Sequence, residues 1–176
     1  MTASTGGSVR EWLAARRPAA IPRRSEPEPR ASSAQQRMWF EDRYRTEIDP
    51  SLPGYASPHA VRMTGPLDVA ALESAFGAVL ARHETLRTTF TTRDGTLYQR
   101  INPPGPVDVR VDPVPDEAGL RTALAAAISE PLDLVRGPIL RARLFRLSDT
   151  EHVLLVVVHH IATDGWSMDI LFRELT

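Results

Sequence analysis

The feature that most constrains this chain is an unbroken apolar run, Val153–Val158, that ends in two histidines. Successive side chains of a strand point to opposite sides of its sheet, so a strand with large apolar residues at every position must be covered on both faces. The 176 residues of the chain are enough to bury such a core. We therefore expect a central strand within a layered α/β or α+β sandwich.

Patterns elsewhere in the chain predict the elements around this strand. The predicted strands are His59–Thr64, Thr88–Thr92, Leu97–Ile101, Val107–Val111 and Leu140–Leu144. Asp94-Gly95 joins the second and third of these as a hairpin turn. The predicted helices begin near Ser33, Asp68, Asp116 and Ser167. Ser33 and Gln36 have the spacing of a capping box at the start of the first helix.

The first part of the chain differs in composition from the rest. Residues 1–30 are rich in Arg and Pro and poor in large apolar side chains, which predicts a flexible leader or a docking segment ahead of a domain at residues 31–176. Val9–Ala15 has the length of two helical turns, either docked on a partner or solvated, and so short a helix is marginal alone. The chain stops within a helical pattern, which favours a fragment of a longer protein.

Charge and composition exclude several classes of function. A formal net charge of -1 provides no basic surface for nucleic acid. The chain has no apolar run long enough for a membrane span and no signal-peptide pattern, so we expect a cytoplasmic protein. Cysteine is absent, which excludes disulfides, thiolate metal ligands and a cysteine nucleophile. All 21 basic residues are Arg, as expected of a GC-rich bacterial genome.

Polar residues follow the apolar run directly, at the place where layered α/β folds put their chemistry. His159 and His160 point to opposite faces, so one of them is expected to be structural. A zinc site would need a further ligand, and only Asp164 is close in sequence. The other interpretation is acid–base work by a neutral imidazole. Asp164 could orient that imidazole, bind a substrate cation or pair with an arginine.

A second polar cluster, Arg82–Thr88, lies where a predicted helix gives way to an extended segment. The cluster is either part of a site or a solvated helix end, where Arg and His interact well with the helix dipole. Gly165, just after Asp164, would let the backbone approach a ligand closely.

Three motifs together resemble the N-terminal half of a condensation domain of nonribosomal peptide synthetases. They are Ser33–Trp39, Arg82–Phe90 and the HHxxxDG stretch His159–Ser167. A fourth stretch, Pro131–Ala142, is also similar to the family. HHxxxDG by itself is shared with other acyltransferases that use coenzyme A or carrier proteins, whereas the three motifs in this order are specific. The resemblance covers about residues 33–176.

The resemblance implies a fold similar to chloramphenicol acetyltransferase, in which two lobes form a V with the active site in the tunnel between them. Only the first lobe would be present here. His160 would deprotonate or position the acceptor amine that attacks the donor thioester. His159 would then be a packing residue.

The family pattern also implies roles for the residues around the histidines. Asp164 would be a structural carboxylate paired with Arg82. The Gly165 amide is a candidate to stabilise the developing oxyanion. Trp166 and Ser167 would support the loop and begin the next helix.

The implied partners are the donor and acceptor peptidyl carrier proteins, the C-terminal lobe and an adjacent adenylation domain. Substrates would arrive on phosphopantetheine arms, and no cofactor or metal would be bound. The alternative interpretations are a related carrier- or coenzyme A-dependent acyltransferase and a non-catalytic recruitment platform. His160, Asp164 and Gly165 are all present, which argues against the platform. Heterocyclising relatives replace the histidine pair and epimerising ones differ after Asp-Gly, so peptide-bond formation leads.

Overall fold

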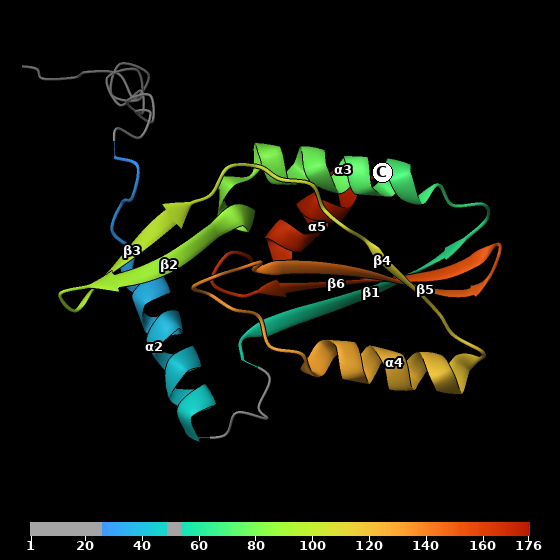
Figure 1. Ribbon diagram of the computed structural model, residues 1–176, viewed down its shortest axis with the longest axis horizontal. Helices are drawn as coiled ribbons and strands as arrows, with labels where there is room; N and C mark the ends of the chain where they lie inside the picture. The colour runs from blue at the N-terminus through green and yellow to red at the C-terminus, as the bar shows by residue number, and fades with distance from the viewer. Residues whose placement is uncertain (1–25, 49–53) are drawn as a thin grey trace, which may run out of the picture.

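The computed structural model describes residues 26–48 and 54–176 as a sheet with helices on both faces (Figure 1). The sheet has the strand order β1-β6-β5-β4. Its strands are β1 (Ala56–Thr64), β6 (Glu151–His159), β5 (Leu140–Ser148) and β4 (Arg110–Pro113). Among these four described strands, only β4 and β5 pair in parallel. The predicted layered sandwich is confirmed, with the apolar run on an internal strand.

Strand β6 is buried on both faces because different helices cover them. Val156 packs with α3 (Val69–Arg82) and α5 (Gly165–Glu174) in one core cluster. Val157 packs with α4 (Glu117–Ser129) in a second cluster, on the opposite side of the sheet. Figure 1 shows α3 and α5 on one side of the sheet and α4 on the other. The period of two along β6 therefore divides its side chains between two cores.

Helices α3 and α4 begin where their predicted caps place them. The Asp68 carboxylate accepts a hydrogen bond from the backbone N–H of Ala71 at 3.1 Å, and Asp116 accepts one from Gly119 at 2.8 Å. Each carboxylate satisfies one N–H of the first turn that has no partner within the helix. Both helices then place apolar residues on the face that covers the sheet.

A separate hairpin consists of β2 (Thr88–Arg93) and β3 (Thr96–Ile101). Its turn residues, Asp94 and Gly95, have φ angles of +48° and +73°. These are the positive values that a two-residue hairpin turn needs at both positions, which confirms the predicted turn. The chain before the first described helix runs along β3: the N–H of Gln99 donates to the carbonyl of Pro29 at 2.8 Å.

The first described helix, α2 (Ser33–Ile48), begins with a capping box one residue earlier than predicted. The N–H of Ser32 donates to the side chain of Gln35 at 2.8 Å, and the N–H of Gln35 donates to the Ser32 hydroxyl at 3.2 Å. The predicted pair of Ser33 and Gln36 is therefore wrong by one position. Both pairs have the same spacing, so the motif itself did not distinguish them.

Strand β4 is shorter than predicted and begins later. The expected strand started at Val107, but β4 starts at Arg110. The N–H of Val109 donates to the Glu73 carboxylate of α3 at 3.0 Å. Because that N–H bonds to a helix side chain, it is not available to a neighbouring strand.

The expected helix at Val9–Ala15 lies outside the described residues, as does most of the segment 1–30. Within the two described ranges, none of the helices combines the length and the apolar character that crossing a membrane requires.

The fold predicts a sharp contrast between two Phe to Ala substitutions. Phe76 is fully buried in the cluster between α3 and the sheet, whereas Phe40 of α2 is 66% exposed. Phe76→Ala should lower the free energy of unfolding by about 3 to 5 kcal/mol, because it leaves a cavity in the core. Phe40→Ala should change it by less than about 0.5 kcal/mol. Denaturant unfolding of both variants measures this, and equal losses would contradict the described core.

Candidate functional site

The histidine loop, residues 160–164, connects the end of β6 to α5. The strand delivers the two histidines to opposite environments. His159 is 1% exposed, whereas His160 is exposed. This division is what the alternation of strand side chains predicts.

The contacts of His160 determine which of its ring nitrogens carries the proton. Nδ1 lies 2.5 Å from the carbonyl oxygen of Thr163. A carbonyl oxygen only accepts, so Nδ1 carries the hydrogen and Nε2 keeps a free lone pair in the neutral ring. Neutral His160 can therefore accept a proton or a hydrogen bond at Nε2.

His160 lines a shallow groove of about 360 Å³ between the histidine loop and the start of α2. The loop side of the groove includes Ala162, Thr163 and Asp164, and the helix side includes Gln35 and Met38. The first and last of the three sequence motifs therefore meet at this groove. A substrate in the groove would reach His160 without any rearrangement of the core.

His159 is buried, and both of its ring nitrogens have hydrogen-bond partners. Its Nδ1 accepts a hydrogen bond from the N–H of Ile161 at 3.1 Å. Its Nε2 must then carry the hydrogen, which it donates to the Asp42 carboxylate of α2 at 3.2 Å. Asp42 also accepts a bond from the N–H of Tyr55 at 3.3 Å.

These contacts keep the half-buried Asp42 ionised. Burial by itself raises the pKa of Asp42, but the hydrogen bonds from the His159 ring and from the N–H of Tyr55 outweigh it. The pKa of Asp42 therefore lies below its usual value, as expected for a carboxylate that accepts several hydrogen bonds.

Asp164 caps α5, and it does not pair with Arg82 as expected. Its Oδ1 accepts hydrogen bonds from the Ser167 backbone N–H at 2.8 Å and from the Ser167 hydroxyl at 2.6 Å, which caps α5. These two bonds hold the pKa of the exposed Asp164 below its usual value, and the nearby His160 lowers it further. Within the described residues, Asp164 forms no ion pair with Arg82 or with Arg87.

The Arg82–Thr88 cluster joins α3 to the end of α5. Arg82 Nε lies 3.6 Å from the Glu174 carboxylate, and His83 Nε2 lies 2.7 Å from its other oxygen. Arg87 donates to the carbonyl oxygens of Leu80 and Asn102. His83 and Arg87 therefore have partners within the protein, whereas Arg82, the last residue of α3, keeps a side chain that is 72% exposed, as a solvated helix end predicts.

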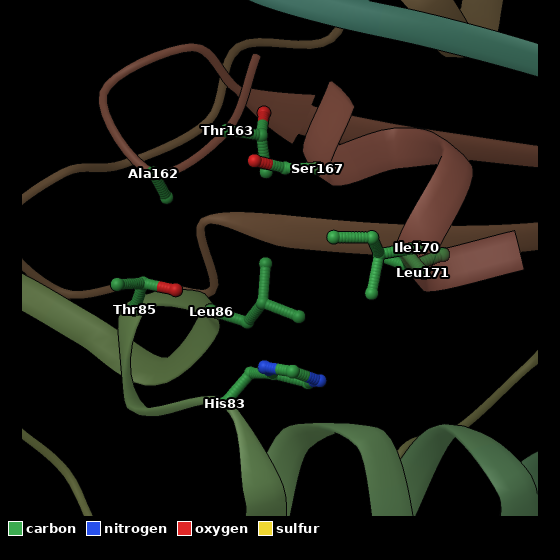
Figure 2. Close-up of a pocket in the computed structure, with 8 residues that line it drawn as sticks. All are labelled: His83, Thr85, Leu86, Ala162, Thr163, Ser167, Ile170 and Leu171. Atoms are coloured by element: carbon green, nitrogen blue, oxygen red, sulfur yellow. The ribbon is translucent and has the colours of Figure 1, made fainter. Parts of the chain in front are cut away.

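A small cavity of about 120 Å³ lies between this cluster and the histidine loop. Figure 2 shows His83 and Leu86 on one side of it, Ala162, Thr163 and Ser167 on the opposite side, and α5 side chains closing it. The residues that line it are His83, Thr85, Leu86, Ala162, Thr163, Ser167, Ile170 and Leu171. The second and third of the three sequence motifs therefore both contribute residues to the lining of this cavity.

Gly165 and Trp166 occupy the first turn of α5. Gly165 begins the helix, where backbone N–H groups have no partner within the helix. A Cβ atom on Gly165 would meet no other atom within 4 Å, so packing in this chain does not require glycine there. Trp166 is 77% exposed. It does not support the loop by packing, which corrects that expectation.

Sequence reasoning missed Asp42 and Glu174. Asp42 lies one turn after Met38, on the same face of α2 as the side chains that pack inward. The one feature of the sequence that could have indicated Asp42 is that it puts a carboxylate on the packed face of a helix. The described part of the chain contains no group of three or more His, Asp and Glu side chains that could hold a metal ion.

Comparison with protein families gives one match that covers most of the chain. The family model described as "Condensation domain" matches residues 26–176. The chain is 44% identical over 151 residues to a linear gramicidin synthase of Brevibacillus parabrevis, with 82% of this chain and 2% of that protein covered. It is 44% identical over 146 residues to the nonribosomal peptide synthetase dtxS1 of Metarhizium robertsii, again with 82% and 2% covered. Bacterial and fungal relatives both occur, so a bacterial source stays a prediction.

Solved structures match the fold. The X-domain from teicoplanin biosynthesis has a TM-score of 0.75 and 41% identity, covering 89% of this chain and 32% of that chain. The starter condensation domain of rhizomide synthetase has a TM-score of 0.74 and 23% identity, covering 85% of this chain and 38% of that chain. The chain thus spans about a third of these structures and a few per cent of the curated relatives. Its fold is one lobe of that architecture.

The capping geometry predicts the effect of removing the Asp164 side chain. Asp164→Ala should lower the melting temperature by a few degrees at neutral pH, because the first turn of α5 loses its cap. Asp169→Ala, on an exposed position of the same helix, should have almost no effect. Thermal unfolding monitored by circular dichroism measures both.

The same substitution has a predicted pH dependence. The pKa of Asp164 is lower in the folded than in the unfolded chain, so its stabilisation is present above the unfolded pKa. It is lost as pH falls through the folded pKa. The difference in melting temperature between wild type and Asp164→Ala should therefore shrink at acid pH, and a difference that grows there would contradict the capping role.

Proposed function

This chain belongs to the condensation-domain family of nonribosomal peptide synthetases, and from that membership we propose that it supplies the acid–base wall of a site that forms peptide bonds. The acceptor would be an aminoacyl group and the donor an acyl or peptidyl thioester. Both would arrive on phosphopantetheine arms of carrier proteins. The adenylation domain that loads the acceptor would be a neighbour in the parent protein.

For each peptide bond formed, one proton must move from the acceptor amine to the departing thiolate. The acceptor nitrogen attacks the thioester carbonyl carbon, so a C–N bond forms and the C–S bond breaks. The amine loses a proton and the departing thiolate gains one. His160 would take the first proton at Nε2 and return it to the sulfur, a role that its Nδ1 hydrogen bond supports.

The observation that carries this proposal is the hydrogen bond between His160 Nδ1 and the Thr163 carbonyl. It leaves Nε2 as an acceptor on an exposed ring beside a groove. The same ring with the proton on Nε2 could not accept the amine proton. The Thr163 carbonyl therefore fixes the tautomer of His160. In many hydrolases a carboxylate fixes the tautomer of the histidine in the same way.

Asp164 and Gly165 would contribute through the first turn of α5. Asp164 holds that turn in place through Ser167 rather than acting as a base. The Gly165 N–H, at the positive end of the helix, is a candidate donor to the oxyanion that forms when the thioester carbonyl is attacked. A second lobe would supply the other wall of the tunnel.

A second candidate function is recruitment of a partner protein without catalysis. A relevant structure is that of the X-domain from teicoplanin biosynthesis in complex with OxyB, because this chain is 41% identical to that X-domain. We rank it second because His160 has the tautomer and the exposure that proton transfer requires. A recruitment surface would not depend on either property.

The first test is the substitution His160→Ala in the complete condensation domain. Formation of the dipeptidyl carrier, followed by mass spectrometry, should fall by about 100-fold or more, because the general base is lost. The melting temperature should change little, since His160 is exposed.

The matched control is His59→Ala, which removes a histidine of β1 that contacts Ser57 and lies outside the histidine loop. It should keep most of the activity. Turnover close to wild type in His160→Ala would overturn the catalytic assignment and favour recruitment.

A second test compares the 176-residue chain with the complete domain. With both loaded carriers present, the chain alone should form no product, because the reactants would lack the opposite wall that aligns them. Alignment of reactants contributes several kcal/mol to such reactions. Condensation by residues 1–176 at a rate comparable to that of the complete domain would show that one lobe is sufficient.

A further inference from the structure

We propose that Asp42 of α2 is a positioning residue: it fixes the tautomer of His159 and thereby orders the loop that presents His160. The catalytic consequence rests on the proposed function. The structural part does not, since it concerns hydrogen bonds within this chain. Asp42 lies outside all of the sequence motifs described above.

The Asp42 carboxylate occupies a tightly defined place. Its Oδ1 lies 3.2 Å from His159 Nε2 and 3.3 Å from the backbone nitrogen of Tyr55. A Cβ atom built on Gly54 would lie only 2.2 Å from Oδ1. The absent side chain of Gly54 therefore makes the space in which the carboxylate meets the imidazole.

The Asp42 carboxylate and the N–H of Ile161 together decide which nitrogen of His159 carries the proton. The N–H of Ile161 points at Nδ1 from 3.1 Å, so Nδ1 must be unprotonated, and Nε2 needs an acceptor. In the described part of the chain, the Asp42 carboxylate is that acceptor. In the other neutral tautomer, two N–H groups would face each other at Nδ1. A buried donor without an acceptor carries a substantial cost.

The effect reaches His160 through the backbone on both sides. The N–H of His160 donates to the carbonyl of Tyr55 at 2.7 Å, and Tyr55 is the residue whose N–H binds Asp42. The Ile161 N–H that His159 accepts belongs to the histidine loop, which also contains Thr163. The carbonyl of Thr163 in turn receives the His160 Nδ1 hydrogen.

Neighbouring histidines therefore hold opposite tautomers for one connected reason. His159 carries its proton on Nε2 because Asp42 accepts it, and His160 carries its proton on Nδ1 because the turn places a carbonyl there. Without the Asp42 carboxylate, the Nε2 hydrogen of His159 and the N–H of Tyr55 lose the acceptor that they share. The histidine loop is then held less firmly. A displacement of about 1 Å at a reacting group can cost about 100-fold in rate.

The test uses three substitutions around the Asp42 carboxylate in the complete domain. Asp42→Leu removes the acceptor and should lower kcat by about 10- to 100-fold with little change in KM. Asp42→Asn keeps an acceptor oxygen and should retain most of kcat. Gly54→Ala keeps the acid but pushes the carboxylate away, and should lower kcat in the same direction.

The matched control is Glu47→Leu. Glu47 is an exposed acid on the same helix, paired with Arg43 at 3.7 Å, so the substitution removes the same charge without touching His159. It should leave kcat unchanged. A role confined to folding would lower the melting temperature of Asp42→Leu but leave the kcat of the folded fraction at the wild-type value, which would overturn the inference.

A spectroscopic readout separates this inference from the proposed function. In the domain labelled with 15N-histidine, His159 should show a protonated Nε2 and His160 a protonated Nδ1, with assignments from His159→Gln and His160→Gln. Asp42→Leu or Gly54→Ala should abolish the His159 pattern. An unchanged pattern in both overturns the inference, whatever the activity of His160→Ala, whereas full activity of His160→Ala overturns only the proposed function.

Discussion

Burial of β6 on both faces is the constraint on which the rest of the structure depends. Val156 and Val157 belong to different cores, so helices are required on both sides of the sheet. An internal strand of this kind is held by two neighbours as well as two layers. Its carboxyl end is consequently a rigid point in the molecule, and the histidine pair begins there. Rigidity at that point is what a site for aligned reactants needs.

The histidine loop is held by its own polar residues. His159 accepts the N–H of Ile161, Thr163 accepts the Nδ1 hydrogen of His160, and Asp164 caps the helix that follows. These three residues of the motif thus each satisfy a backbone or ring group nearby. One histidine is left with a lone pair facing solvent, because every other ring nitrogen of the pair is occupied. His159, which is buried at the end of β6, and His160, the proposed proton acceptor, are adjacent in the sequence.

The expected pairing of Arg82 with Asp164 shows where reasoning from sequence reached its limit. Both residues lie at helix ends close to the site, and the resemblance to the family implied that they pair. Helices α3 and α5 pack with the end of α3 near the end of α5, so Arg82 and His83 meet Glu174 instead. Asp164, at the start of α5, satisfies the helix it precedes. Sequence spacing carries no information on how two packed helices are aligned.

The sequence by itself determined the features that depend on near neighbours: the caps at Asp68 and Asp116, the Asp94-Gly95 turn, the doubly covered strand and the opposite faces of the two histidines. These follow from backbone geometry and the periods of strand and helix. Only the tertiary structure decided which carboxylate meets which imidazole. His159 and Asp42 are 117 residues apart, and His83 and Glu174 are 91 apart. Such contacts arise from the packing of α2 and α5 against the rest of the chain, which no local pattern encodes.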